Sequence, residues 1–186
     1  MKAEHLYKSF GDKSVIEDLS FEALNGITGI FGASGAGKTT LLRIIAGLEK
    51  ATSGTVSGAG IISFCFQEAR LFPWESALSN AAIKEHTPGI ARKILTELGL
   101  ENDLSTKAAS LSGGMKKRVA LARSLAAPYD TLLLDEPFAG LDGALRSKAF
   151  DIIAEYSAGR CVLLVSHDAG IISKAERVIE LKRNPR

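Results

Sequence analysis

Short apolar runs alternate with amphipathic stretches along most of the chain. Three continuous apolar runs, at 27–31, 131–134 and 161–165, have the length and composition of strands buried on both faces of a sheet. After the first two, at 41–48 and 144–156, apolar residues recur with helical spacing. Buried strands that alternate with helices predict an α/β domain built on a mostly parallel sheet.

The N-terminal part has the pattern of a small antiparallel β subdomain. Residues 2–7 and 14–23 alternate between apolar and polar side chains, and Gly11-Asp12 supplies a turn between them. Residues 54–60 are rich in glycine and polar residues, which predicts a turn-rich connection. Further strands are expected at 61–66 and 176–181.

The character of the chain changes between residues 70 and 110. The β-branched runs disappear, and Pro73, Pro88 and Gly89 break up the pattern. Residues 76–84 and 90–98 have helical spacing, which indicates a small helical insertion. We therefore expect one domain over 1–186, with a core formed by 1–70 and 111–186 and a helical subdomain at 71–110.

A helix of about 14 residues is predicted from Ser112 to just before Pro128. Ser112 is a suitable N-cap, because its hydroxyl can accept a hydrogen bond from the first turn. One face of the helix is apolar, formed by Met115, Val119, Ala122 and Ala126. Basic residues are expected on the other faces as a solvated surface, in preference to a nucleic-acid patch; they are Lys116, Lys117, Arg118 and Arg123.

The composition limits the classes of function. The 186 residues are 46% hydrophobic, enough for a proper core, and the net charge of +2 gives no strong electrostatic argument for nucleic acid. The polar N-terminus predicts no signal peptide, and no apolar run approaches the ~18–20 residues of a membrane span. Cys65 and Cys161 lie far apart in strand-like runs, which predicts buried, reduced thiols without a metal and a cytoplasmic protein.

A glycine-rich stretch lies between the strand at 27–31 and the helix at 41–48. It matches the G-x-x-x-x-G-K-[ST] pattern without a mismatch. Its glycines permit backbone angles that turn N–H groups around an anion, and the helix adds the positive end of its dipole. Lys38 is expected to reach the β- and γ-phosphates of a nucleotide, and the Thr39 hydroxyl to bind Mg²⁺. A glycine-rich turn without a ligand would leave these two residues unexplained. The predicted nucleotide-binding residues are Gly32, Ala33, Ser34, Gly35, Ala36, Gly37, Lys38, Thr39 and Thr40.

Polar residues follow the predicted strands at the edge where ligands bind in open α/β folds. Asp135 suits the Mg²⁺ shell, and Glu136 is placed to orient and deprotonate a water; the alternative is a surface turn. His167 follows the strand at 161–165, either as a phosphate contact or as a structural histidine. Phe10, at the N-terminal turn, is either a platform for an adenine ring or a partly covered surface aromatic.

The order of these motifs resembles the ATP-binding subunits of ABC transporters over nearly the whole chain. Such a resemblance implies a P-loop NTPase core of the ABC ATPase type, with ATP and Mg²⁺ as ligands. The motifs that carry it, beyond the phosphate loop and Asp135-Glu136, are Gln67 of the glutamine loop, Leu111-Ser112-Gly113-Gly114 of the signature, Ala139-Gly140-Leu141-Asp142 of the D-loop, and the switch histidine His167. Phe10 stands where the family places its adenine-stacking aromatic.

The resemblance implies that two copies close head to tail on two ATP molecules. Each γ-phosphate is then held by Lys38, Gln67 and His167 of one copy, with Glu136 as the catalytic carboxylate and Gln67 also at the metal. The partner copy supplies the signature, Ser112, Gly113 and Gly114, and Asp142 lies at the dimer seam. Closing and opening of this dimer is expected to drive alternating access in a membrane permease.

The segments around 66–74 and 135–138 resemble importers of the nitrate, sulfonate and taurine group, and related thiamine-pyrimidine or riboflavin importers. This likeness implies permease and solute-binding partners and a peripheral position on the inner face of the membrane. Phe72 and Trp74 either form the groove for a permease helix or pack the helical insertion. Three features depart from the family: Met115 replaces Gln as the fifth signature residue, Ala139-Gly140 is an uncommon pair, and the chain is short, with no regulatory C-terminal domain expected.

Two other functions remain as alternatives. The first is a soluble ABC ATPase in a nucleic-acid or ribosome-linked role, which the single domain and the mild charge disfavour. The second is a phosphate-loop kinase or GTPase with a small substrate, in which residues 111–114 would have no role.

Overall fold

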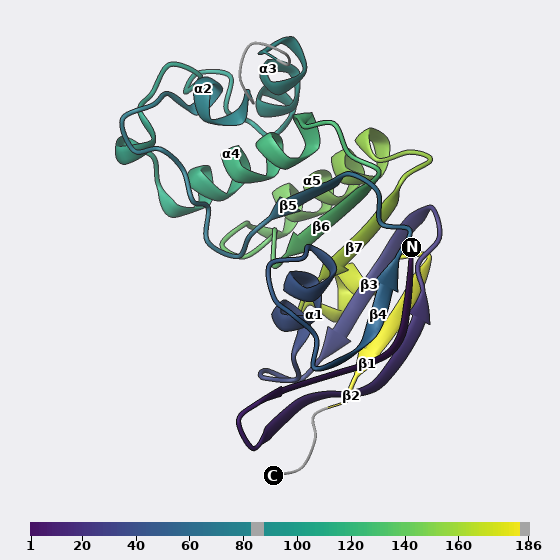
Figure 1. The fold of residues 1–186 in the computed structure, drawn as a ribbon. Coiled ribbons are helices and arrows are strands. Elements are labelled where there is room, and N and C mark those ends of the chain that lie inside the picture. The colour runs from purple at the N-terminus through teal and green to yellow at the C-terminus, as the bar shows by residue number, and fades with distance from the viewer. Residues whose placement is uncertain (83–87, 183–186) are drawn as a thin grey trace.

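The computed structural model describes residues 1–82 and 88–182, and Figure 1 shows the fold. Five parallel strands form the central sheet in the order β5-β6-β7-β3-β8. A second sheet of three antiparallel strands has the order β2-β1-β4, with β1 at Lys2–Phe10, β2 at Lys13–Glu22 and β4 at Ser53–Ser57. The α/β class with a mostly parallel sheet is therefore confirmed. The parallel strands are β3 (Gly26–Gly32), β5 (Ile62–Cys65), β6 (Thr131–Asp135), β7 (Cys161–Val165) and β8 (Arg177–Leu181).

The two faces of the parallel sheet are covered by different cores. Every residue of β6 and β7 is buried, which explains why these strands read as continuous apolar runs. Leu132 and Leu134 of β6 pack in a core with helices α4 (Gly113–Ala126) and α5 (Gly143–Tyr156). Leu133 between them packs in a second core with α1 (Lys38–Ile45) and the antiparallel sheet. Each such leucine contributes roughly 1.5–3 kcal/mol by its burial, so both faces fix the position of these strands.

The antiparallel sheet contains one strand that the sequence pattern missed. β1 (Lys2–Phe10) and β2 (Lys13–Glu22) form the predicted hairpin, but β4 (Ser53–Ser57) occupies part of the expected turn-rich connection at 54–60. The prediction was wrong there because β4 is held by pairing with β1, about fifty residues away, and not by an apolar pattern of its own. Gly54 allows this approach: a Cβ at this position would lie 2.2 Å from the His5 carbonyl oxygen.

Three of the helices lie together at one end of the molecule. In Figure 1 these are α2, α3 and α4, and β1 and β2 lie at the opposite end, with the parallel sheet between them. Pro88 begins α3, whereas the sequence pattern treated it as a break; proline fits a first helical position because no N–H is needed there. The predicted helix at 76–84 is observed to Ala81, and its last two residues lie outside the described part. The helices are α1 (Lys38–Ile45), α2 (Ala77–Ala81), α3 (Pro88–Glu97), α4 (Gly113–Ala126), α5 (Gly143–Tyr156) and α6 (Ala169–Ile172).

Arg118 and Arg123 of α4 lie against backbone groups and not on the solvated face that the sequence predicted. All four basic residues of this helix are partly buried. The Arg118 Nη1 atom donates to the Leu98 and Gly99 carbonyl oxygens, at 2.8 and 3.3 Å. Arg123 donates to two carbonyl oxygens of the segment after β5. The prediction was wrong because these two side chains fold over the helix surface onto backbone groups distant in the sequence.

Both cysteines are buried and free, as predicted. Burial raises the pKa of the Cys65 thiol to about 11, so this group stays protonated at neutral pH. Within residues 1–82 and 88–182, no helix combines the length and apolar character that crossing a membrane requires.

Candidate functional site

The glycine-rich stretch forms a loop between the end of β3 and the start of α1. Gly37 stands at the N-cap of α1 with a φ of +92°, a left-handed conformation that side chains rarely adopt. A Cβ on Gly37 would also lie 2.8 Å from the Cγ1 atom of Val15 on β2. Glycine is therefore required here for two reasons, and it leads the chain into the N-terminus of α1, where backbone N–H groups can bind an anion.

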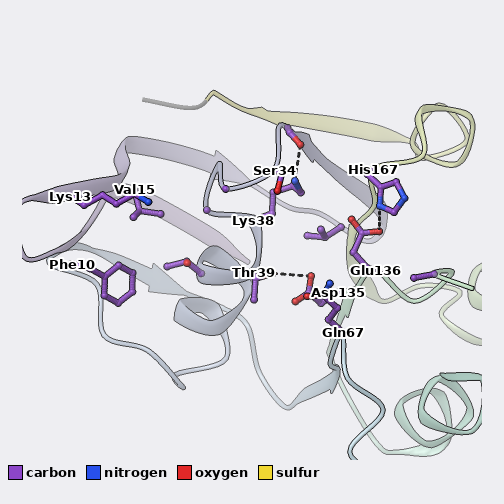
Figure 2. A pocket seen from close by; sticks show the side chains of 16 residues that line it. Phe10, Lys13, Val15, Ser34, Lys38, Thr39, Gln67, Asp135, Glu136 and His167 are labelled. Carbon is purple, nitrogen blue, oxygen red and sulfur yellow. Dashed lines mark hydrogen bonds and ion pairs between the residues drawn. The ribbon is translucent and has the colours of Figure 1, made fainter. Parts of the chain in front are cut away.

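The Lys38 ammonium lies back against the carbonyl oxygens of this loop. Its Nζ atom donates to the Gly32 oxygen at 2.7 Å and to the Ala33 oxygen at 3.0 Å. Figure 2 shows Lys38 beside the loop, on the side that faces the pocket. The cation is thus already held at the place where the loop can receive an anion.

Thr39 and Asp135 join the loop to the end of β6. The Thr39 hydroxyl donates to the Asp135 carboxylate across 3.2 Å, as Figure 2 shows. Asp135 is 2% exposed. Burial raises the pKa of Asp135 above its ordinary value, and the neighbouring Glu136 charge adds to this; the Thr39 hydrogen bond lowers it. The contacts around the ionised Asp135 carboxylate do not fully offset the cost of burying its charge, so this carboxylate is suited to bind a cation.

Glu136 and His167 meet at the carboxyl ends of β6 and β7. The His167 Nδ1 atom lies 2.9 Å from a Glu136 carboxylate oxygen, an ion pair when the imidazole is protonated. The Glu136 side chain is 13% exposed and that of His167 is 76% exposed. Glu136 has a φ of +51°, and its backbone N–H donates to the Val165 carbonyl oxygen. A non-glycine residue held in this region stores strain of the kind found at functional sites.

One pocket of about 670 Å³ brings most of the predicted residues together. The loop, Gln67, the two acidic residues, His167 and Phe10 line it (Figure 2). Within the described residues, three or more His, Cys, Asp or Glu side chains do not cluster as a metal site would require. The predicted residues that line the pocket are Phe10, Gly32, Ser34, Gly35, Gly37, Lys38, Thr39, Thr40, Gln67, Asp135, Glu136 and His167.

Phe10 ends β1 and lines the pocket, and the residue is 50% exposed. The Lys8 ammonium lies 4.4 Å from the centre of the ring. Lys8 is itself held by the Glu49 carboxylate at 2.7 Å and the Lys50 carbonyl oxygen at 2.8 Å. One face of the ring is thus covered by a fixed cation, and Phe10 also lines the pocket.

Sequence reasoning missed four lining residues. Lys13 pairs with Phe10 across the N-terminal hairpin, so the strand register could have indicated it. Val15 and Val165 are ordinary apolar side chains whose sequence carries no sign of a ligand, and Ala139 was named only as a member of the D-loop motif.

Six predicted residues lie away from the lining of this pocket. Ala33 and Ala36 belong to the loop without lining the pocket, and Ala36 is buried. Ser112 is the N-cap of α4 and accepts a hydrogen bond from the Met115 N–H at 3.3 Å. Gly113 and Gly114 begin that helix, and Gly113 is exposed, as is Ser112. Asp142 caps α5 by accepting from the Leu145 N–H at 2.9 Å, and it is also exposed.

The site therefore combines three chemical capacities. A glycine loop, a helix N-terminus and Lys38 can bind a polyphosphate. The Thr39 hydroxyl and the Asp135 carboxylate are oxygen ligands of the kind that Mg²⁺ prefers. Glu136, in hydrogen-bonding distance of His167, can accept a proton from a water molecule.

Comparison with known proteins agrees with this arrangement. The ABC transporter family matches residues 16–139. The aliphatic sulfonates import ATP-binding protein SsuB 2 of Mesorhizobium japonicum is 38% identical over 98% of this chain and 77% of its own length. The protein of the same name in Pseudomonas syringae is 40% identical over 97% of this chain and 69% of its own.

Two solved structures are similar over almost the whole chain. The dimeric structure of MJ0796, described as a bacterial ABC transporter cassette, has a TM-score of 0.85 and 28% identity, and covers 97% of this chain and 94% of that one. The dimeric post-hydrolysis state of the same cassette, bound to ADP and Pi, has a TM-score of 0.84 and 26% identity, and covers 99% and 96%.

Proposed function

This chain belongs to the ABC transporter family, and from that premise we propose that it is the ATP-hydrolysing subunit of a small-solute importer, with aliphatic sulfonates as the cargo class. Its activity is the hydrolysis of ATP to ADP and phosphate, coupled to transport. The observation that carries the proposal is the single pocket in which the phosphate loop, the Thr39–Asp135 pair and the Glu136–His167 pair meet. Cargo is recognised by other subunits, since this pocket is built for a nucleotide.

ATP binds with its phosphates in the loop between β3 and α1. Lys38 exchanges the Gly32 and Ala33 carbonyl oxygens for the β- and γ-phosphates, so the cation moves only a short way from the place it already occupies. The adenine stacks on the free face of Phe10, which Lys8 holds from the other side.

The chemistry of Thr39 and Asp135 fits Mg²⁺ as a ligand of this site. Two observations indicate this fit. The buried Asp135 carboxylate has a raised pKa, because its neighbours do not offset the cost of burying its charge, and the Thr39 hydroxyl faces it. Thr39, Asp135 and Gln67 would hold the ion, which neutralises phosphate charge and orients the triphosphate when bound.

Hydrolysis depends on Glu136 and His167. Glu136 orients a water molecule opposite the γ-phosphate and accepts its proton, and its left-handed backbone directs the carboxylate into the pocket. His167, exposed beside Glu136, turns its ring to a γ-phosphate oxygen. The imidazole thus adds a hydrogen bond to the group whose charge changes in the reaction.

The signature residues act on the ATP of a second copy. Ser112 and Gly113 are exposed at the N-terminus of a 14-residue helix, which is a favourable place for an anion, yet they lie away from this chain's own pocket. A head-to-tail homodimer brings Ser112, Gly113 and Gly114 of one protomer over the triphosphate of the other, with Asp142 at the seam. The similarity to dimeric cassettes supports this assembly.

The permease contacts the surface around Phe72 and Trp74. These residues are 58% and 67% exposed, and their ring centres lie 5.7 Å apart, so they form an exposed aromatic pair near Gln67. The proposal places the subunit at the cytoplasmic face of the membrane, with a solute-binding protein in the same system. It also divides the chain into a core (1–70 and 111–186) and a helical subdomain (71–110). Nucleic acid has no part in it.

Glu136→Gln tests the function. The variant is expected to lower ATP hydrolysis at least about 100-fold, because the proton acceptor is lost, and to keep ATP affinity within about twofold. With ATP and Mg²⁺ it is expected to elute as a dimer in size-exclusion chromatography. Glu17→Gln, an exposed glutamate on β2, is the matched control and should behave as the unmodified protein.

Two results would contradict the proposal. One is hydrolysis that persists in Glu136→Gln, and the other is a variant that stays monomeric with bound ATP. Stimulation of hydrolysis by a reconstituted permease separates the importer from a soluble ABC ATPase, which DNA or ribosomes would stimulate instead. Hydrolysis without any second substrate argues against a kinase.

A further inference from the structure

The segment that follows Gln67 connects the pocket to the exposed aromatic pair. Gln67 lines the pocket, and only seven residues later Trp74 is exposed to solvent. Between them, Leu71 packs against the main core, and both the N–H and the carbonyl of Phe72 are hydrogen-bonded to the Asn80 side chain. The two ends of the segment are thus a candidate nucleotide contact and a candidate permease contact.

The middle of this segment is held by one side chain from α4. The Arg123 Nη1 atom donates to the Arg70 carbonyl oxygen, and its Nη2 atom donates to the Ala69 carbonyl oxygen, both at 2.9 Å. The planar guanidinium therefore binds two consecutive backbone carbonyls with a charged donor, which makes strong and directional contacts. Burial lowers the pKa of Arg123 below its ordinary value, in line with a half-buried position.

The backbone at Arg70 is shaped for this contact. In an extended chain successive carbonyls point in opposite directions, so one guanidinium reaches both only where the chain leaves that geometry. Arg70 has a φ of +46°, a left-handed conformation that is uncommon for a residue with a side chain. Its own guanidinium lies 4.2 Å from the centre of the Phe66 ring, and Phe66 stacks on Phe64 of β5. Arg70 is thus held at its backbone carbonyl by Arg123 and at its side chain by Phe66.

Arg123 belongs to the helix that begins at the signature. Ser112 caps α4, and Arg123 follows eleven residues later, about 16 Å along the helix axis. A helix transmits a displacement along its axis because its backbone hydrogen bonds keep it stiff. Arg123 is therefore the contact through which a movement of residues 69–70 would reach the helix that carries Ser112.

We propose that Arg123 is a positioning residue that couples Gln67 in the pocket to α4. Occupancy of the pocket then sets the position of Ser112 for the second copy and of Trp74 for the permease at the same time. The inference rests on the proposed function, because Gln67 must respond to bound nucleotide. A coupling claim of this kind needs evidence that both sites move together, which the experiment below supplies.

Arg118 is a matched control on the same helix. It too donates to two consecutive carbonyl oxygens, those of Leu98 and Gly99, and it too is partly buried. Its partners lie at the end of α3, within the helical part, and not in the segment between Gln67 and Trp74. Loss of Arg118 therefore removes a similar contact from the fold without touching the proposed connection.

The test compares Arg123→Met, Arg123→Lys and Arg118→Met in the full chain. Trp74 is the only tryptophan, so its fluorescence reports on the segment directly. Steady-state hydrolysis gives kcat and KM for ATP, thermal unfolding gives Tm, and the Trp74 emission is recorded with and without ATP and Mg²⁺ in the Glu136→Gln background. Kinetic constants are normalised to the folded fraction.

Arg123→Met is expected to lower kcat at least about tenfold, to change KM less than about threefold, and to abolish the Trp74 response to nucleotide. Arg123→Lys, which keeps the charge and a donor, restores part of both. Arg118→Met lowers Tm but keeps kcat and the Trp74 response within about twofold. If Arg123 couples the two sites, its loss lowers kcat, whereas loss of Arg118 lowers only Tm. If both residues only stabilised the fold, the two variants would show similar changes.

The proposal is overturned if Arg123→Met keeps the kcat and Trp74 response of the unmodified chain, or if Arg118→Met loses both to the same degree. Should Arg123→Met fail to fold, Arg123→Lys decides: a kcat lowered at least about threefold with unchanged KM supports the coupling, and an unchanged kcat overturns it. An unmodified chain that neither binds nor hydrolyses ATP would instead refute the proposed function, so the two failures are distinguishable.

Discussion

Asp135→Asn should make the nucleotide-free protein more stable while removing its activity. Asp135 is 2% exposed, and burial together with the adjacent Glu136 charge raises its pKa. Asparagine has nearly the same shape, and its carbonyl oxygen can still accept the Thr39 hydrogen bond that the structure shows at 3.2 Å. The substitution therefore removes a buried charge and keeps the contact around it.

The gain follows from two opposing effects. A buried ion costs several kcal/mol of desolvation, and a hydrogen bond to a charged group returns roughly 1.5–3 kcal/mol. The Arg43 and Lys38 charges return a further part. We expect a net gain of about 1–2 kcal/mol in the free energy of unfolding at pH 7, or roughly 2–8 °C in Tm for a domain of this size.

The same reasoning predicts the direction in which stability changes with pH. Because the folded-state pKa of Asp135 lies above the ordinary value of 3.8, the folded state binds the proton more tightly than the unfolded state. The unmodified protein therefore loses stability as pH rises from 3.8 through the folded-state pKa. The advantage of Asp135→Asn should be absent below that window and constant above it.

Thermal and urea unfolding of both proteins without nucleotide, from pH 3 to pH 8, would measure this. Asp151→Asn, an exposed aspartate on α5, is the control and should change stability by less than about 0.5 kcal/mol. ATP with Mg²⁺ should stabilise the unmodified protein and have little effect on Asp135→Asn. A variant that is less stable than the unmodified protein at pH 7, or equally stabilised by ATP and Mg²⁺, would refute the reasoning.

Two further predictions concern the walls of the pocket. Phe10→Ala should weaken ATP binding roughly tenfold in calorimetric titration, because a base stack contributes ~1–3 kcal/mol; inorganic triphosphate, which has no base, should bind equally to both proteins, and a loss for both ligands would argue against stacking. Gly37→Ala should lower the free energy of unfolding by roughly 1–3 kcal/mol and abolish nucleotide binding, since it combines a φ of +92° with a contact to Val15. Gly143→Ala, which meets open space, is its control in the same denaturation series, and an equal effect of the two would count against the steric argument.

Asp135→Asn and Glu136→Gln change neighbouring carboxylates with opposite surroundings. Asp135 faces the Thr39 hydroxyl in the interior, whereas Glu136 faces His167 at the mouth of the pocket. The two side chains have different surroundings because Asp135 is the last residue of β6, whereas Glu136 follows the strand. The left-handed backbone at Glu136 marks the point where the chain leaves β6.

Much of the fold could be predicted from local patterns. The buried strands β3, β6 and β7, the N-terminal hairpin and the helix that begins after Ser112 all appear where their apolar spacing and capping residues place them. The phosphate loop could be predicted as well, because its conformation depends on residues that are close together in the sequence, namely the glycines, Lys38 and Thr39. Their roles towards a ligand remain predictions.

Other features could not be predicted because their partners are distant in the sequence. β4 has no apolar pattern and exists through its pairing with β1. The Lys8 cation beneath Phe10 is fixed by Glu49 and the backbone of Lys50. Nothing in the local sequence around Arg123 indicates carbonyl partners more than fifty residues earlier.

The sequence by itself determined which torsion angles and which apolar faces were available, since both depend on residues within one turn or strand of each other. The tertiary structure alone decided which remote charges and carbonyls meet. Those contacts depend on the path of the whole chain. The sequence around a cation such as Arg123 does not indicate whether its side chain will be solvated or will donate to a backbone oxygen.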